Sequence, residues 1–329
     1  MENKTNAAPA APLVSYQLDA EISRSLNDFF NRLGPVDQVP PGDSQQMKKT
    51  GNKIYVAMKD QLPAFAEVKR EDHEMKAGDG SSIRLRWYST QAEAEKGPAV
   101  VFIHGGGRMY GSVDLYDHTV AGYVHYSNVP FLSVEYGLTP DTYGKAQAEQ
   151  ALDAVLWLKE NAAQFGVDVN RIAIMGDSGG GGIAAGAAIL ARDRNIFLAK
   201  QILIYPMIDY RNTVIDESLE ALATVKYQVL ATCWNAIMGP GQLSDYDLMV
   251  TSPSCLDNFK GLAPAYIAVG DLDYFRNENL DYARKLAAAT VPLEFHLYPG
   301  APHGFEIFTP DTALAQHAVA DHVRAIQSV

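Results

Sequence analysis

The sequence lacks the features that mark several large classes of protein. Its only cysteines are Cys233 and Cys255 in 329 residues, too few for a disulfide scaffold, and no CxxC pair or Cys/His cluster indicates a zinc site. No apolar run reaches about 18 residues, so we expect no membrane span. The first residues lack the basic and apolar regions of a secretion signal. We therefore expect a cytoplasmic protein with reduced thiols and no bound metal.

Positive charge is also scarce. Lys and Arg together number 27 against 39 Asp and Glu, which gives a formal net charge of −12. Because nucleic-acid binding needs a basic face, we expect no nucleic-acid partner. Hydrophobic residues make up 47% of the chain and charged residues 20%, as in ordinary globular proteins. A chain of this length can bury a large core without disulfides or metals.

Short apolar stretches of strand length alternate with longer segments of helical periodicity. We expect strands at Ile83–Tyr88, Ala99–Ile103, Phe131–Tyr136, Arg171–Met175, Gln201–Tyr205, Ala265–Val269 and Leu293–Tyr298. We expect helices at Ala148–Phe165, Gly180–Arg192, Glu278–Ala288 and Thr312–Ile326. This alternation predicts an α/β fold, with a mostly parallel central sheet of about eight strands and helices on both faces.

Two parts of the chain fall outside this rhythm. No clear strand lies between Met207 and Ala263, and Glu217–Met238 has a helical pattern. Open α/β sheets bind ligands at the carboxyl ends of their strands, so we expect this insertion to cover that edge. The segment before the first strand is also helical in pattern. We predict a helical cap made of residues 1–55 and an inserted segment 207–255, and a catalytic domain made of residues 56–206 and 256–329.

The most informative local pattern is Gly-Asp-Ser-Gly-Gly at residues 176–180. It follows an apolar strand and precedes a helix of small residues, the context of a nucleophile elbow in which Ser178 projects above the sheet. The helix N-terminus there favours developing negative charge. A dinucleotide-binding turn beginning at Gly179 is the alternative, but the nearest suitable acid, Asp209, lies about 30 residues further on rather than about 20.

A second glycine-rich turn, His104-Gly-Gly-Gly107, follows another apolar strand. Consecutive glycines let main-chain N–H groups turn toward one point, as in an oxyanion hole. The N–H of Gly179, directly after the serine, is the expected third donor. We expect His104 itself to anchor the loop rather than to act in catalysis.

An acid and a histidine follow two later strands. Asp271 and Asp273 both come after the strand at 265–269, and either carboxylate can orient a histidine or cap a turn. His303 lies in a Pro/Gly loop after the last strand and is placed to act as a base. The chain order Ser178, Asp, His303 is that of the α/β-hydrolase fold.

From about Ile83 to the C-terminus these motifs resemble the hormone-sensitive-lipase-like carboxylesterases, family IV of the bacterial lipolytic enzymes. The glycine turn resembles the family's oxyanion motif, and residues 176–180 are similar to its Gly-Asp-Ser-Ala-Gly. Asp273-Tyr-Phe-Arg-Asn-Glu278 aligns with the family's Asp-Pro-Leu-Arg-Asp-Glu, a register that selects Asp273 over Asp271. His303-Gly-Phe305 matches His-Gly-Phe.

The resemblance implies an α/β-hydrolase fold with a Ser178-His303-Asp273 triad and with Gly106 and Gly107 as the first two oxyanion donors. We expect a serine carboxylesterase without a cofactor, acting through an acyl-enzyme on short-to-medium acyl or small natural-product esters. The candidate substrate-binding residues are Arg108, Tyr110 and Asp177.

Several motifs depart from the family pattern. Gly179 stands where the family has alanine, Tyr136-Gly-Leu-Thr-Pro-Asp141 replaces Tyr-Arg-Leu-Ala-Pro-Glu, and Arg108-Met-Tyr110 replaces a more apolar stretch. Two other functions stay open: a non-catalytic small-ligand receptor on the same fold, and a lactone, amide or thioester hydrolase. The family often pairs, so a homodimer is a possible assembly.

Overall fold

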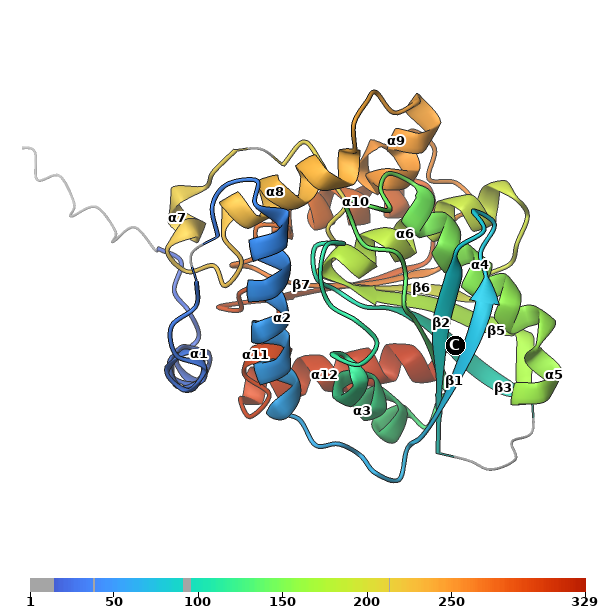
Figure 1. Ribbon diagram of the computed structural model, residues 1–329, viewed down its shortest axis with the longest axis horizontal. Helices are drawn as coiled ribbons and strands as arrows, with labels where there is room; N and C mark the ends of the chain where they lie inside the picture. Colours follow the sequence, from blue (N-terminus) through green and yellow to red (C-terminus); the bar gives the residue numbers. More distant parts are fainter. Residues whose placement is uncertain (1–14, 38, 91–95, 213) are drawn as a thin grey trace, which may run out of the picture.

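The computed structural model describes residues 15–37, 39–90, 96–212 and 214–329, and these form an eight-stranded sheet between two layers of helices (Figure 1). The strand order is β1-β2-β4-β3-β5-β6-β7-β8. β1 and β2 pair antiparallel with each other, β2 pairs antiparallel with β4, and all later pairs are parallel. The strands are β1 Lys69–Lys76, β2 Ser82–Ser89, β3 Gly97–Ile103, β4 Phe131–Val134, β5 Val167–Asp177, β6 Lys200–Ile204, β7 Ala265–Gly270 and β8 Leu293–Tyr298. The predicted mostly parallel α/β sheet is confirmed.

Helices α4, α6 and α10 pack on one face of the sheet, and α3, α11 and α12 pack on the other (Figure 1). α1 packs against α11 on that second side, with the ring of Phe29 edge-to-face on that of Phe308. No described helix is both long and apolar enough to cross a bilayer. The helices are α1 Ala20–Leu33, α2 Ser44–Asp60, α3 Asp117–Ser127, α4 Ala146–Glu160, α5 Ala162–Phe165, α6 Ser178–Asp193, α7 Glu217–Glu220, α8 Tyr227–Met238, α9 Asp245–Thr251, α10 Arg276–Ala288, α11 Phe305–Phe308 and α12 Ala313–Gln327, with a 3₁₀ turn at Pro253–Cys255.

The central strands are continuous apolar runs because helices cover both of their faces. Residues 99–103 of β3 and 172–175 of β5 are completely buried. Helix α6 packs unusually close to its surroundings because it is rich in glycine and alanine. A Cβ atom on Gly182 would lie 2.0 Å from the carbonyl oxygen of Met207, and one on Gly186 would lie 2.4 Å from that of Val250.

Some elements differ from the sequence-based expectation. β1 was not expected: it is an edge strand in which only Met75 is buried, so its sequence carries little apolar signal. α3 was also not expected. The helix expected over Glu217–Met238 is interrupted, because α7 ends at Glu220 and α8 begins at Tyr227.

A third apolar cluster lies beyond the carboxyl ends of the strands and joins distant parts of the chain. Met47 of α2 contacts Cys233 of α8 through their sulfur atoms at 3.9 Å. Trp234 of α8 belongs to the same cluster, together with residues that directly follow β6 and β7, among them Met207 and Leu272. α2 and α8 therefore meet over the edge of the sheet where the site residues lie (Figure 1). The first 14 residues of the expected segment 1–55 lie outside the described residues.

Candidate active site

Ser178 lies at the junction of β5 and α6 with φ of +53°, a left-handed conformation that is strained for a serine. Small neighbours permit this sharp turn. A Cβ atom on Gly176 would lie 2.4 Å from the carbonyl oxygen of Gly180, and one on Gly180 would lie 2.2 Å from that of Ile103. The strand–turn–helix context expected for a nucleophile elbow is therefore present.

His303 connects Ser178 to Asp273. Its Nε2 lies 3.0 Å from Ser178 Oγ, and its Nδ1 lies 2.7 Å from Asp273 Oδ2. The serine and the histidine are each 8% exposed and the aspartate is 1% exposed. The other oxygen of Asp273 accepts a hydrogen bond from the main-chain N–H of Phe275 at 2.9 Å, which fixes the carboxylate. A serine, a histidine and a carboxylate in contact in this order have the geometry that a Ser-His-Asp triad requires.

Asp271, the competing acid, faces away from this arrangement. Its Oδ1 accepts a hydrogen bond from the main-chain N–H of Gly300 at 2.7 Å, and its own N–H donates to the carbonyl of Tyr298. It therefore joins the end of β7 to the turn after β8. Of the two carboxylates, that of Asp273 is the one in contact with His303.

The glycine turn after β3 lies against the start of α6. A Cβ atom on Gly179 would lie 2.9 Å from the amide nitrogen of Gly107, so the two backbones are in contact. Gly106 and Gly107 have φ of +113° and +57°. In the described part of the chain their N–H groups donate no hydrogen bond, and the N–H of Gly179 has no partner within the helix because it lies in the first turn. These amides are free to bind an oxyanion near Ser178.

His104 holds this turn in place, as expected. It is completely buried; its Nδ1 lies 2.8 Å from the carbonyl oxygen of Gly105, and its ring stacks on Tyr136 at 4.4 Å. The Tyr136 hydroxyl donates to the carbonyl of His104 at 3.0 Å. Further along, the amide of Gly111 donates to the side chain of Asn52 on α2 at 3.0 Å.

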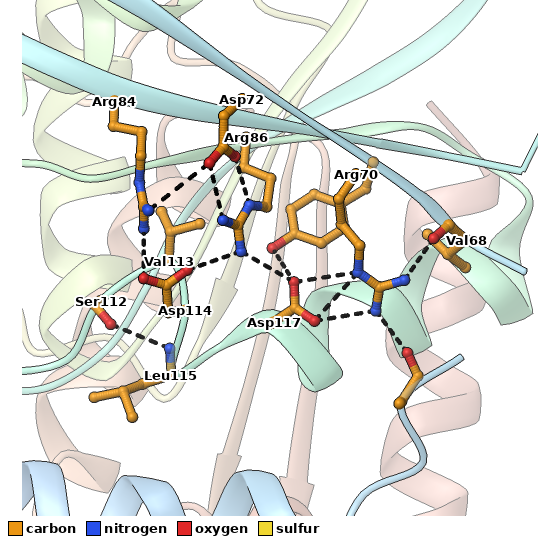
Figure 2. Close-up of polar contacts among 12 residues, drawn as sticks. Val68, Arg70, Asp72, Arg84, Arg86, Ser112, Val113, Asp114, Leu115 and Asp117 are labelled. Carbon is orange, nitrogen blue, oxygen red and sulfur yellow. Dashed lines mark hydrogen bonds and ion pairs between the residues drawn. The ribbon is translucent and has the colours of Figure 1, made fainter. Parts of the chain in front are cut away.

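Ion pairs anchor the next segment, residues 112–117, to the antiparallel edge of the sheet (Figure 2). Arg86 of β2 lies 2.9 Å from a carboxylate oxygen of Asp114 and 3.3 Å from one of Asp117. A network of this kind stabilises more than an isolated surface pair does. The network holds the segment 112–117 in place, and Tyr116 of this segment lines the cavity beside Ser178. The cluster also includes Arg70, Asp72, Arg84 and Glu135.

A cavity of about 120 Å³ opens beside Ser178 and His303. Its walls are mostly apolar and come from both the sheet edge and the helices above it. Tyr110, an expected substrate contact, lines it. The other lining residues include Tyr55, Met58, Tyr116, Tyr205, Thr224, Leu230, Cys233, Phe275 and Ile307.

Arg108 and Asp177, the other two expected substrate contacts, are not brought to this cavity. Arg108 has φ of +61° and is 1% exposed. Its guanidinium donates to the carbonyls of Gly179 at 3.3 Å and Thr251 at 3.0 Å and lies over the ring of Trp234. Burial lowers the pKa of this guanidinium to about 10. Arg108 thus connects the site to the segment around α9.

Asp177 is completely buried, and neither carboxylate oxygen has a hydrogen-bond partner within the described ranges. Burial raises the pKa of the Asp177 carboxyl well above its ordinary value, and the Coulomb interaction with Glu306 raises it further. The expectation that Arg108 and Asp177 contact substrate directly is therefore corrected. Both side chains are buried and lie in the packed wall behind the site.

Several residues around His303 carried no clear sequence signal. The centroid of the His303 ring lies 4.5 Å from that of the Tyr205 ring and 5.1 Å from that of the Phe275 ring, with edge-to-face geometry in both cases. The hydroxyl of Thr224 donates to the His303 carbonyl at 2.6 Å. Glu306 carried a weak signal, a carboxyl within the otherwise apolar stretch after Gly304.

Comparisons with known proteins agree with this geometry. Residues 100–307 match the family model described as the alpha/beta hydrolase fold. Esterase LipI of Mycobacterium tuberculosis is 33% identical over 227 residues, which cover 68% of this chain and 70% of LipI. The ethyl acetate hydrolase of Pseudomonas putida is 31% identical over 247 residues, 71% of this chain and 74% of that protein.

A solved structure is similar over nearly the whole length. The bacterial heroin esterase has a TM-score of 0.85 to this chain at 26% identity, covering 95% of this chain and 98% of its own. The fold and the reaction class expected from the motifs are confirmed. The chain therefore belongs to the hormone-sensitive-lipase-like esterases of the α/β-hydrolase fold and is a carboxylic ester hydrolase.

Proposed function

We propose that the chain hydrolyses esters of short acyl groups through an acyl-enzyme formed on Ser178. The observation that carries this proposal is the position of His303, whose two ring nitrogens lie 3.0 Å from Ser178 Oγ and 2.7 Å from Asp273 Oδ2. A base in contact with both a hydroxyl and an orienting carboxylate is what serine acyl transfer requires.

In this mechanism Ser178 Oγ attacks the acyl carbon while His303 Nε2 takes the hydroxyl proton. Asp273 holds the Nδ1–H tautomer and stabilises the imidazolium that forms. His303 then gives the proton to the alcohol oxygen as the ester C–O bond breaks. Water attacks the acyl-enzyme with His303 again as base, and the carboxylic acid leaves as Ser178 regains its proton. Every proton passes through His303, so the cycle needs no cofactor.

The N–H groups of Gly106, Gly107 and Gly179 bind the oxyanion of each tetrahedral intermediate. They lie on two backbone segments in contact beside Ser178. Because these donors are positioned before the reaction, each stabilises the transition state at little reorganisation cost, and the loss of one costs about 3 kcal/mol.

The size of the cavity supports a short acyl group. At about 120 Å³ it is smaller than the cavity of ~150 Å³ that holds a benzene molecule in an engineered protein. The likeness to an ethyl acetate hydrolase agrees with a small acyl group. We assign the described residues of the segments 1–55 and 207–255 to a cap, because Met47 and Cys233 from these segments pack together over the site.

A fluorophosphonate probe tests the nucleophile. Labelling of the wild-type protein at Ser178, and its absence in Ser178→Ala, is the expected result; labelling that persists in the variant contradicts the assignment.

Asp273→Asn should lower kcat by about 10⁴-fold, whereas Asp271→Asn should lower it far less, and the reverse ranking contradicts the choice of Asp273 as the triad acid.

A substrate panel tests the range. Turnover of p-nitrophenyl acetate and butyrate should exceed that of the octanoate, because the longer chain exceeds the cavity. A preference for octanoate contradicts the short-acyl proposal. A matched lactone, anilide and thioester series should react more slowly than the acetate; if one of them reacts faster, the subclass is reassigned while the acyl-enzyme mechanism stays.

A further inference from the structure

Glu306 is a buried carboxyl group that the proposed triad does not use. It lies on α11, three residues after His303, and is 3% exposed. One of its oxygens accepts a hydrogen bond from the hydroxyl of Tyr205. The other oxygen, Oε2, has no hydrogen-bond partner in the part of the chain that the structure describes. A carboxyl group in this position is costly to bury, so it needs a physical explanation.

Tyr205 joins Glu306 to His303. Its ring lies 4.5 Å from the His303 ring at an interplanar angle of 60°, while its hydroxyl reaches the carboxyl. Its backbone has φ of +34°, a strained conformation for a tyrosine, and its N–H is held by the carbonyl of Ala268 at 2.6 Å. Strain of this kind persists where the surrounding structure imposes it, and it clusters at functional sites.

We propose that Glu306, acting through Tyr205, is a positioning residue for His303: its ionised form holds the Tyr205 ring against the imidazole and favours the imidazolium that forms when Ser178 attacks. Protonation of Glu306 removes that charge and slows acylation. This inference rests on the proposed function, because it assigns His303 the role of base.

The electrostatics of the site support the proposal. Burial raises the pKa of the Glu306 carboxyl to about 7, against the lowering effects of the Tyr205 hydrogen bond and of the Coulomb interaction with His303. Coupling between two sites is reciprocal. An ionised Glu306 therefore attracts the positive charge that develops on the imidazole in the transition state.

Other titratable groups face Glu306 from every packed element. Asp273 raises the pKa of the Glu306 carboxyl through the Coulomb interaction, and Asp177 of the β5–α6 turn interacts with it as well. Asp273 contacts His303 directly, whereas burial raises the pKa of the Asp177 carboxyl, so Asp177 is the main competitor for any titration seen near pH 7. The remaining groups are Tyr123 of α3, Tyr298 of β8, and His118, Asp311 and Arg324 in the groove that Glu306 also lines.

Glu306 also borders a groove that is separate from the substrate cavity. The groove measures about 740 Å³ and lies between α3 and α12, and Glu306 and Ile307 are part of its lining. Ile307 also lines the cavity beside Ser178, so α11 separates the two spaces. Because Glu306 borders this groove and does not line the substrate cavity, we expect its ionisation to affect kcat as well as kcat/KM.

The pH dependence of acylation tests the proposal. The readouts are kcat/KM for p-nitrophenyl acetate and the rate constant for labelling of Ser178 by a fluorophosphonate, each from about pH 5 to 9. The wild-type profile should show two ionisations on its acidic side, one of them near pH 7. Glu306→Gln keeps an acceptor for the Tyr205 hydroxyl but has no charge. It should show one ionisation and a plateau about tenfold lower.

Two further variants separate the alternatives. Tyr205→Phe keeps the ring against His303 but removes the hydrogen bond to Glu306. It should lower kcat with little change in KM. It should also shift the ionisation that the wild type shows near pH 7 to higher pH, because this hydrogen bond lowers the pKa of the Glu306 carboxyl. Asp177→Asn should keep both ionisations. A wild-type profile with a single acidic ionisation, a Glu306→Gln profile identical to that of the wild type, or loss of the ionisation near pH 7 in Asp177→Asn overturns the proposal.

Failure of the proposed function gives a different result, because the wild-type protein would then show no labelling at Ser178 at any pH. Thermal unfolding of each variant checks the fold. If Glu306→Gln does not fold, the wild-type and Tyr205→Phe profiles still decide the outcome, since both predict how the ionisation near pH 7 behaves.

Discussion

The hydroxyl of Thr224 donates a hydrogen bond of 2.6 Å to the main-chain carbonyl of His303. Thr224 lies between α7 and α8 in the inserted segment and lines the cavity beside Ser178. The insertion is thus connected directly to the backbone of the proposed base, and any movement of the insertion will act on the position of the imidazole.

Thr224→Val should test this connection, since valine has nearly the same shape but no hydroxyl. We expect kcat/KM for p-nitrophenyl acetate to fall about five- to tenfold, because a carbonyl that loses its partner costs about 1 kcal/mol or more. Thr224→Ser keeps the donor and should retain most of the activity. Equal activity in all three proteins would mean that the hydrogen bond does not position His303.

Gly179 should not accept the alanine that the resemblance places at this position in the family. A Cβ atom there would lie 2.7 Å from the amide nitrogen of Arg108 and 2.9 Å from that of Gly107. Gly179→Ala would push the oxyanion turn away from Ser178. We expect a loss in kcat of about 10²-fold or more, the cost of a misplaced oxyanion donor.

Gly78→Ala is the matched control, because its Cβ would have ordinary contacts, 3.5 Å from the carboxylate of Asp153. It should leave kcat unchanged. A Gly179→Ala protein with the activity of the wild type would show that the turn is able to shift without harm to the donors.

The sequence predicts a helix or strand well where burial of that element requires a recognisable pattern of apolar residues. In the second half of β5 the apolar run 172–175 is followed by Gly-Asp-Ser-Gly-Gly, so the strand, the turn and the position of Ser178 follow together. β1 does not follow, because at the edge of the sheet its charged side chains pair with Arg84, Arg86 and the segment 112–117 instead of packing in the core. Edge strands often carry such charges.

The site shows the same division. Ser178, Asp273 and His303 lie shortly after the ends of β5, β7 and β8, and the parallel sheet brings them together. Arg108 was placed wrongly in the cavity because its φ of +61° turns its side chain toward Gly179 and Thr251, a direction that spacing along the chain does not encode. Contacts such as that of Thr224 depend on the conformation of the insertion and have no local pattern.

Arg108→Lys should destabilise the protein although it conserves charge. The buried guanidinium reaches two carbonyls on different segments, those of Gly179 and Thr251, and lies over Trp234. A lysine cannot reproduce this planar fork, and its ammonium is more strongly hydrated. We expect the free energy of unfolding in urea to fall by about 2 kcal/mol.

Arg284→Lys is the control for that measurement, because this side chain is 69% exposed and pairs with Asp281 on the surface of α10. Its effect should stay within about 0.5 kcal/mol. If Arg108→Lys changes stability as little as the control does, the buried guanidinium is not needed to connect the two segments.

His322 on α12 should make the protein sensitive to acid. It is 1% exposed, neither ring nitrogen has a hydrogen-bond partner among the described residues, and burial lowers the pKa of its imidazole to about 3 from an ordinary 6.5. Between about pH 3 and 6.5 the His322 imidazole therefore binds a proton in the unfolded chain but not in the folded chain. Stability from this group is complete above about pH 6.5 and falls as the pH drops toward 3, by about 1.4 kcal/mol per pH unit.

His322→Leu removes this proton from the unfolded state. Between about pH 6.5 and 4.5 the variant should lose about 2 kcal/mol less of its free energy of unfolding than the wild type does. His317→Leu is the control on the same helix, because its ring is 68% exposed, and its stability should follow the wild-type curve. Parallel curves for the wild type and His322→Leu would show that His322 is protonated equally in the folded and unfolded states, contrary to its burial between Tyr123 and Tyr266.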